Sequence, residues 1–136
     1  RTIRSLAVVL SQFEGNKFTF IGPESLKASE DLKSLLDEKG VQFEETDDLS
    51  KGVEADILYM NRLQEERFAD RSEFEKYRKL FVLTSGMLKD KSVLVMNPLP
   101  RIDEIEEDVD SLPNAIYFKQ ARNGVPIRMA LLSMMA

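Results

Sequence analysis

The chain has 136 residues, of which 43% are hydrophobic and 32% are charged, a balance typical of one globular domain and not of a disordered segment. The formal net charge is −5 and no run of Lys and Arg occurs, which excludes a general attraction to nucleic acids or anionic membranes but allows a local site for a small anion. The chain has no Cys and no His, so thiol nucleophiles, disulfides, an imidazole base and the commonest zinc ligands are excluded, and we expect no metal and no cofactor.

The first half of the chain predicts helices and strands in alternation. Apolar residues at spacings of three and four indicate an amphipathic helix that begins near Thr2, and Gly40 suits the C-terminal end of a later helix. The expected elements, in order, are a helix over residues 2–13, a strand over 17–21, a helix capped by Ser29, a strand over 41–44 and a short helix over 48–53.

The second half continues this alternation. Residues 57–60 are too apolar for a half-exposed strand, so we expect them to be buried. Ser72 and Glu75 have the spacing of a capping box, which predicts the start of a helix. The expected elements, in order, are a strand over residues 55–60, a helix after Ser72, a short strand over 81–83, a brief helix at 87–88, a strand over 93–96 and a helical tail over 125–135.

Strands and helices therefore alternate about five times, with connections too long for hairpins. This pattern predicts an α/β fold, a doubly wound and mostly parallel sheet of about five strands with helices on both faces, in a single domain over residues 1–136. No apolar run is long enough to span a membrane and no signal-like segment opens the chain, so we expect a cytoplasmic protein. Because the chain begins at Arg1 without Met, we expect processing or excision from a longer polypeptide.

Two stretches, residues 58–68 and 96–105, run from an apolar strand directly into Arg, Gln and Asn, and strand ends are where open α/β sheets bind ligands. Arg62 and Gln64 are separated by one residue, so in an extended chain they point the same way and offer three or more donors to a carboxylate. The alternative is that Arg62 pairs with a neighbouring Glu. Arg67 is interpreted as a surface charge or as a residue that positions the site through an ion pair.

The second stretch contains two prolines around one residue, which stiffen the backbone and remove two N–H donors. The carbonyls near Pro98 and Leu99 are then available as acceptors beside the guanidinium of Arg101. This arrangement suits a ligand that has both an amide N–H and an anionic group. The alternative is a plain turn that ends the strand. A cis peptide bond before Pro100 would be a specific structural feature of this turn, because cis bonds are uncommon even before Pro.

Other features have weaker signals. Arg1 and Thr2 lie at a helix start, where backbone N–H groups and the helix dipole favour anions, and the alternative is a frayed terminus. The methionines near the end of the chain are interpreted as core or interface packing and not as a cofactor site. The acidic residues of 103–108, Glu104 included, are interpreted as a solvated face.

Four motifs of this sequence resemble the second half of the catalytic chain of the aspartate carbamoyltransferase family. The motifs occur in the family's order and spacing and span essentially the whole chain. They are residues 1–6, 58–68, 97–105, and 117–124 with 128–132. The ornithine sibling is disfavoured, because its motif has a Cys beside the Leu-Pro turn and this chain has none.

The resemblance implies a domain that binds L-aspartate, which attacks carbamoyl phosphate to give N-carbamoyl-L-aspartate in pyrimidine biosynthesis. It implies that Arg1 and Arg62 clamp the two carboxylates of the substrate, that Gln64 assists, and that Thr2 lies beside them. Catalysis would come from positioning and from charge stabilisation without a covalent enzyme intermediate, and no residue of this domain alone would be catalytic.

The resemblance also implies that the Pro98 and Leu99 carbonyls receive the carbamoyl amide and that the Leu99–Pro100 bond is cis. Arg67, Pro100 and Arg101 are expected as supporting residues. The family's Ser-Thr-Arg-Thr phosphate loop, and the Lys that reaches in from an adjacent subunit, do not occur in this sequence. Carbamoyl phosphate would therefore bind through a first domain missing here, in a full-length enzyme expected to be a homotrimer.

Three positions depart from the family pattern. Asn97 and Arg4 stand where the family usually has His, and Asn61 stands where it usually has Thr. Asn97 can still donate and accept hydrogen bonds, although its side chain does not titrate.

Three hypotheses remain open at this point. The first is an aspartate-binding domain that is inactive without its first domain. The second is a non-catalytic carbamoyltransferase paralogue that acts as an assembly or scaffold domain. The third is a stand-alone amino-acid sensor, which would need a complete pocket within these residues.

Overall fold

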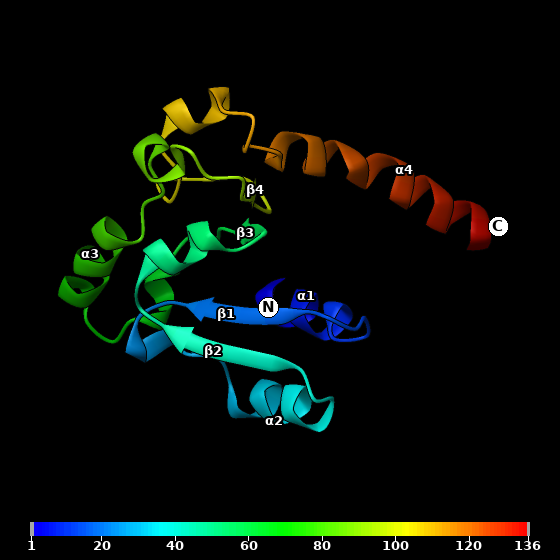
Figure 1. Cartoon of the computed structure of the whole chain (residues 1–136), viewed down its shortest axis with the longest axis horizontal. Helices are drawn as coiled ribbons and strands as arrows, with labels where there is room; N and C mark the ends of the chain where they lie inside the picture. The colour runs from blue at the N-terminus through cyan, green and yellow to red at the C-terminus, as the bar shows by residue number, and fades with distance from the viewer. Residues whose placement is uncertain (1, 136) are drawn as a thin grey trace. The chain divides into compact units, whose positions relative to one another are not determined.

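The computed structural model describes residues 2–135 (Figure 1). Its main helices and strands are α1 (Thr2–Leu10), β1 (Lys17–Ile21), α2 (Glu30–Glu38), β2 (Gln42–Thr46), β3 (Ile57–Tyr59), α3 (Arg71–Leu80), β4 (Leu94–Met96) and α4 (Tyr117–Met135). Short 3₁₀ helices are η1 (Glu24–Leu26), η2 (Leu49–Glu54), η3 (Glu65–Arg67), η4 (Ser85–Leu88) and η5 (Glu107–Ser111). The described chain divides into two compact units. Unit 1 holds the residues up to 52 and residues 64–81, and unit 2 holds residues 53–63 and the residues from 82 onward.

Unit 1 is built on a parallel pair of strands. β1 and β2 pair over five residues, from Lys17 opposite Gln42 to Ile21 opposite Thr46. Parallel strands need a crossover connection, and α2 supplies it. The core of this unit contains Ala7, Leu32 and Leu36 with the partly buried Val8, Phe18, Phe20, Ala28, Val41 and Phe43. Helices α1 and α2 therefore bury their apolar faces in one cluster with the strands.

Local side-chain chemistry sets the helix ends in unit 1. The first helix is predicted to reach residue 13, but α1 ends at Leu10. The side-chain amide of Asn16 donates to the carbonyls of Leu10 at 2.9 Å and Phe13 at 3.1 Å, which stabilises a turn there. Gly40 has φ +67° after α2, a conformation that costs Gly little, and this confirms the predicted helix end.

The start of α3 differs from the prediction. The N-cap is Asp70, whose carboxylate accepts from the Ser72 N–H at 2.9 Å, and Ser72 itself lies inside the helix. The predicted capping box from Ser72 to Glu75 is therefore wrong. Asp and Ser cap helices about equally well, because each places an oxygen near the free N–H groups of the first turn, so the sequence alone does not choose between them.

Unit 2 is built on β3 and β4, which also pair in parallel, with Leu58 opposite Val95. Val95 makes a further parallel bridge to Ala115, and Leu83 makes one to Ile105. The buried apolar side chains of this unit are Val53, Leu58, Met60, Leu83, Leu88, Val93, Val95, Ile105, Val109 and Tyr117.

The α/β class and the parallel pairing are confirmed, but the predicted count of strands is wrong. The described residues form four strands in two separate pairs and not one sheet of about five. The strand predicted over 81–83 contributes only the Leu83 bridge, since η4 begins two residues later. Predicted burial of residues 57–60 is wrong for Ile57, which is 55% exposed, because alternate strand residues face opposite sides.

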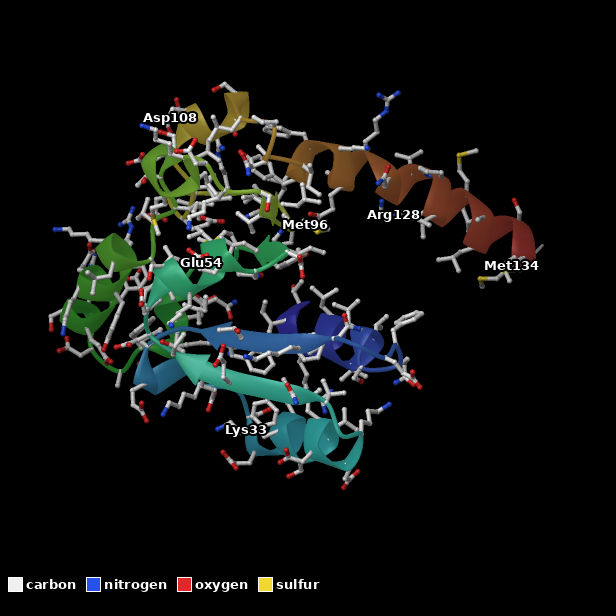
Figure 2. The ribbon with its side chains drawn as sticks, in the orientation of Figure 1. Lys33, Glu54, Met96, Asp108, Arg128 and Met134 are labelled. Carbon is white, nitrogen blue, oxygen red and sulfur yellow. The ribbon has the colours of Figure 1, made fainter. Side chains whose placement is uncertain are left out.

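Helix α4 begins at Tyr117, well before the helical tail predicted from residue 125, and it contains Pro126. Tyr117 is fully buried, whereas the helix is exposed over most of its length from Ala121 onward. Figures 1 and 2 show α4 extending away from the rest of unit 2, with Met134 near its far end. Within residues 2–135, no helix is both long enough and apolar enough to cross a membrane.

Candidate functional site

The segments that follow β3 and β4 lie at one edge of unit 2, because the two parallel strands end side by side. Tyr59 is opposite Met96, the last residue of β4, and the N–H of Met60 donates to the Met96 carbonyl at 2.8 Å. Arg62 follows β3 and Pro98 follows β4. The structure therefore brings Arg62 of the first stretch and Pro98 of the second to the carboxyl ends of adjacent parallel strands, where open α/β sheets bind ligands.

Arg62 is exposed at this edge of unit 2, and Leu63 after it is partly buried. Gln64 belongs to unit 1, where its backbone is extended and its side-chain amide donates to Glu66 Oε1 at 3.4 Å. The binding roles of Arg62 and Gln64 stay predictions, as does their common direction.

The remaining candidates of the first unit are Thr2 and Arg67. Thr2 is exposed in the first turn of α1, and Arg1 before it lies outside the described residues. Arg67 is exposed and lies in η3. The backbone N–H of Arg67 donates to the carbonyl of Gln64 at 3.0 Å. The roles of Arg1, Thr2 and Arg67 stay predictions.

The Leu-Pro turn after β4 has a defined backbone geometry. The Leu99–Pro100 peptide bond is cis, as the resemblance implies, and Leu99 has φ +52°, a left-handed conformation that is uncommon for residues other than Gly. The Asn97 side chain supports this turn, because its Oδ1 accepts from the Leu99 N–H at 2.7 Å. Pro98 and Pro100 are exposed and Leu99 is partly buried, so the turn lies at the surface of the edge.

The guanidinium of Arg101 forms an ion pair within unit 2. Its Nη2 donates to Asp110 Oδ2 at 2.7 Å, and its Nη1 donates to Asp110 Oδ1 and to the Tyr117 hydroxyl oxygen at 3.2 Å. The hydrogen bonds from Arg101 lower the pKa of Asp110, and burial together with the Asp110 carboxylate raises the pKa of Tyr117 to about 12. Arg101 thus links the Leu-Pro turn to η5 and to the start of α4, which fits a supporting role. Sequence reasoning missed Asp110 and Tyr117, because no local spacing relates them to Arg101.

The predicted solvated acidic face is wrong for Glu104, which is 4% exposed. Its Oε1 accepts from Asn97 Nδ2 at 2.9 Å, and its Oε2 accepts from the N–H groups of Ile102 at 2.9 Å and Asp103 at 3.2 Å. Burial of a carboxylate needs such partners, and only the folded turn supplies them. The sequence carries no signal that separates Glu104 from its acidic neighbours.

No group of three or more His, Cys, Asp or Glu side chains among residues 2–135 could hold a metal ion. A hollow of unit 1 is lined by Lys17 at the start of β1, by the first half of β2 up to Glu44, and by residues between α2 and β2. Lys17 and Glu44 pair with each other at 3.5 Å, and ligands are expected at the opposite ends of parallel strands, so we assign this hollow no function.

The fold and the edge together define a class, that of α/β domains in which the segments following adjacent parallel strands meet at one edge. A family model described as aspartate/ornithine carbamoyltransferase, Asp/Orn binding domain, matches residues 1–135. The chain belongs to this family.

Three similar proteins illustrate the match. The aspartate carbamoyltransferase catalytic subunit of Thermofilum pendens is 47% identical over 98% of this chain and 44% of its own length. The solved catalytic subunit of M. jannaschii aspartate transcarbamoylase superposes with a TM-score of 0.90 at 41% identity, over 97% of this chain and 44% of that one. Aspartate transcarbamoylase from Trypanosoma cruzi, solved in complex with carbamoyl aspartate and phosphate, has a TM-score of 0.79 at 33% identity, over 97% of this chain and 42% of that one. The chain thus spans less than half the length of these relatives.

Proposed function

We propose that this chain is the aspartate-binding half of an aspartate carbamoyltransferase, which transfers the carbamoyl group of carbamoyl phosphate to L-aspartate. The observation that carries the proposal is the shared edge of β3 and β4, where an exposed Arg62 and the Pro98–Leu99 turn follow adjacent strands. The family match and the carbamoyl aspartate and phosphate bound to the Trypanosoma cruzi enzyme support it. In this proposal residues 1–136 act as one domain, which does not turn over without the carbamoyl phosphate half.

The proposed chemistry assigns each group a role. Arg62 and Arg1 bind the two carboxylates of aspartate, Gln64 assists, and Thr2 lies beside them. A guanidinium suits this role because its fixed N–H fork matches the two oxygens of a carboxylate. The neutral amine of aspartate then forms a bond to the carbamoyl carbon, the bond from that carbon to the phosphate oxygen breaks, and the proton lost by the amine passes to the leaving phosphate.

The Leu-Pro turn has the second role in this proposal. The carbonyls of Pro98 and Leu99 accept the N–H groups of the carbamoyl amide and thereby fix the electrophile in front of the amine. Orientation of two bound reactants accounts for a large part of such catalysis, so the rigidity of the turn matters more than any acid or base within this chain. Arg67, Pro100 and Arg101 are supporting residues.

Helix α4 supports the proposal that a further half is needed. Its apolar side chains are exposed along the described helix, with Val125 at 58%, Leu132 at 68% and Met134 at 84%. A contiguous exposed apolar surface marks an interaction site, and we propose that the carbamoyl phosphate half covers it. The predicted core packing of the C-terminal methionines is wrong for Met129 and Met134, whereas interface packing stays open.

The wider setting also belongs to this proposal. We expect a homotrimer of the full-length enzyme in the cytoplasm, with L-aspartate and carbamoyl phosphate as its ligands and no cofactor, nucleic acid or membrane partner. A functional assay separates this from a scaffold paralogue. Carbamoyl transfer on mixing the chain with a separate carbamoyl phosphate half would exclude a purely structural role, and failure of transfer by a correctly assembled complex would favour the scaffold.

Calorimetry with succinate, a dicarboxylate that cannot react, tests the binding site directly. We expect heat of binding to the wild-type chain and a loss of about tenfold or more in affinity for Arg62→Ala, because a carboxylate then loses a charged bidentate partner. Arg71→Ala is the matched control, since Arg71 is an exposed Arg of the same chain with its side chain 80% exposed. Equal heats for wild type and Arg62→Ala would remove Arg62 from the site.

A further inference from the structure

Two polar side chains are buried directly behind the Leu-Pro turn. Asn97 is 1% exposed and Glu104 is 4% exposed, although both side chains are polar. Among the described residues, no buried side-chain nitrogen or oxygen lacks a hydrogen-bond partner. Asn97 and Glu104 are too deeply buried to bind a ligand themselves, so their role must be exerted through the turn.

Hydrogen bonds connect the two side chains in a fixed direction. The Leu99 N–H can only donate, so the Asn97 oxygen faces it, at 2.7 Å. The Asn97 nitrogen therefore faces away and donates to Glu104 Oε1 at 2.9 Å. This chain of bonds requires an acceptor at its end, and the Glu104 carboxylate is that acceptor.

The same carboxylate also holds the far side of the turn. Its Oε2 accepts from the backbone N–H groups of Ile102 and Asp103, so one side chain binds the segment entering the turn and the segment leaving it. Glu104 is itself fixed, because its carbonyl accepts from the N–H of the fully buried Leu83 at 2.9 Å. The rigid anchor thus lies in the core of unit 2.

A third contact completes the support. The Asn97 N–H donates to Gln120 Oε1 at 3.2 Å, and Gln120 lies in the first turn of α4. The residue that enters the turn is therefore bound through its backbone to α4 and through its side chain to Glu104.

We propose that Glu104 is a positioning residue of the carbamoyl transfer reaction, which acts through Asn97 to set the orientation of the Pro98 and Leu99 carbonyls. This inference rests on the proposed function, because it assigns those carbonyls to the carbamoyl amide. It predicts that the side chains at 97 and 104 must be complementary, one an amide that donates and accepts and the other a group that only accepts, as Asn97 and the Glu104 carboxylate are in this chain.

Exchanging the amide at position 97 and the carboxylate at position 104 tests whether the two side chains must be complementary. In Glu104→Gln, one end of the new amide places an N–H against either Asn97 Nδ2 or the backbone N–H groups, so one contact is lost. In Asn97→Asp, two carboxylates face each other. In the double variant Asn97→Asp/Glu104→Gln, the Asp accepts from Leu99 and from the Gln nitrogen, while the Gln oxygen accepts from Ile102 and Asp103. The double variant restores every bond.

The kinetic experiment uses the complete enzyme that contains this chain. We expect each single variant to lose about tenfold to a hundredfold in kcat, since small misplacement of a positioned group has effects of this size, and the double variant to recover to within a few-fold of wild type. Succinate affinity should stay within about twofold of wild type in all variants, a split that general unfolding would not produce. Glu106→Gln, an exposed neighbour, is the matched control and should match wild type throughout.

Amide hydrogen exchange in the chain alone provides a readout that does not depend on catalysis. We expect the Leu99 amide to lose protection in Glu104→Gln, although it does not contact Glu104, and to regain it in the double variant. Wild-type protection and wild-type kcat in Glu104→Gln would overturn the inference, as would a double variant as impaired as the single ones. Absence of carbamoyl transfer by the wild-type enzyme would instead refute the proposed function. The exchange data would still show whether Glu104 holds the Leu99 amide in place through Asn97.

Discussion

Loss of the Asp110 charge should destabilise unit 2 by an amount that the geometry of its ion pair sets. Asp110 receives two hydrogen bonds from the Arg101 guanidinium and one from the Tyr117 hydroxyl. In Asp110→Asn the charge is lost, and a side-chain amide cannot accept all three bonds because its nitrogen is a donor. Arg101 would then be left without its counter-charge.

The burial of the Arg101–Asp110 ion pair decides how far the free energy of unfolding falls. The Arg101 side chain is 17% exposed and the Asp110 side chain is 32% exposed. Exposed pairs contribute about 0–1 kcal/mol, and breaking a fully buried pair costs about 3–5 kcal/mol. After allowance for solvent screening at the exposed side of Asp110, we expect Asp110→Asn to lower the free energy of unfolding by about 2 kcal/mol at pH 7.

Urea denaturation followed by circular dichroism measures this difference, with Glu106→Gln as a control of the same charge change at an exposed neighbouring position. The control should lie within about 0.5 kcal/mol of wild type. The pKa of Asp110 is lowered in the folded state by Arg101, so its stabilisation is present above the unfolded pKa of about 3.9 and is lost as pH falls through the folded pKa. The difference between wild type and Asp110→Asn should therefore be constant from pH 5 to 8 and shrink below about pH 4. A difference below about 0.5 kcal/mol at pH 7, or one unchanged at pH 2, would refute this reasoning.

Three further predictions concern the rest of the chain. Leu36 is fully buried in the core of unit 1, so Leu36→Ala should lower the free energy of unfolding, measured by urea denaturation, by about 3 kcal/mol. A loss below about 1 kcal/mol would contradict the packing of α2 on this core. Asp70→Ala should lower the melting temperature, whereas Asp70→Asn should preserve it at pH 7, because Asn also accepts from the Ser72 N–H; equal melting temperatures for the two variants would remove Asp70 as the cap. Leu132→Glu should change the stability of the chain alone by less than about 0.5 kcal/mol, because Leu132 is 68% exposed, but should weaken binding of the carbamoyl phosphate half in a sizing assay; a large loss of stability, or unchanged binding, would refute the interface proposed for α4.

Several features could be predicted from the sequence because they depend on a few neighbouring residues. Alternation and aromatic content located the strand at Lys17–Ile21 to the residue, and Gly40 marked the end of α2 because a left-handed residue favours glycine. The edge of β3 and β4 was also predictable in outline, since parallel strands end at the same side of a sheet. The cis Leu99–Pro100 bond came from the resemblance to a family and not from the physics of the dipeptide.

Features that depend on distant partners could not be predicted in this way. Glu104 has the same local sequence character as its exposed acidic neighbours, and it is buried only because Asn97 and the backbone of residues 102 and 103 provide donors there. The choice of Asp70 over Ser72 as the helix cap depended on where the chain turned, since both residue types cap well.

The sequence by itself determined the α/β class, most helix and strand positions and the two stretches that follow β3 and β4, because periodicity and turn residues act locally. Only the tertiary structure decided which polar residues of those stretches face solvent and which support the turn. Arg101 is held by Asp110 and Tyr117, and Glu104 is enclosed by the turn that it stabilises. The physical reason is that a buried charge is tolerated only where the fold brings its partners within hydrogen-bond distance, and those partners come from other parts of the chain.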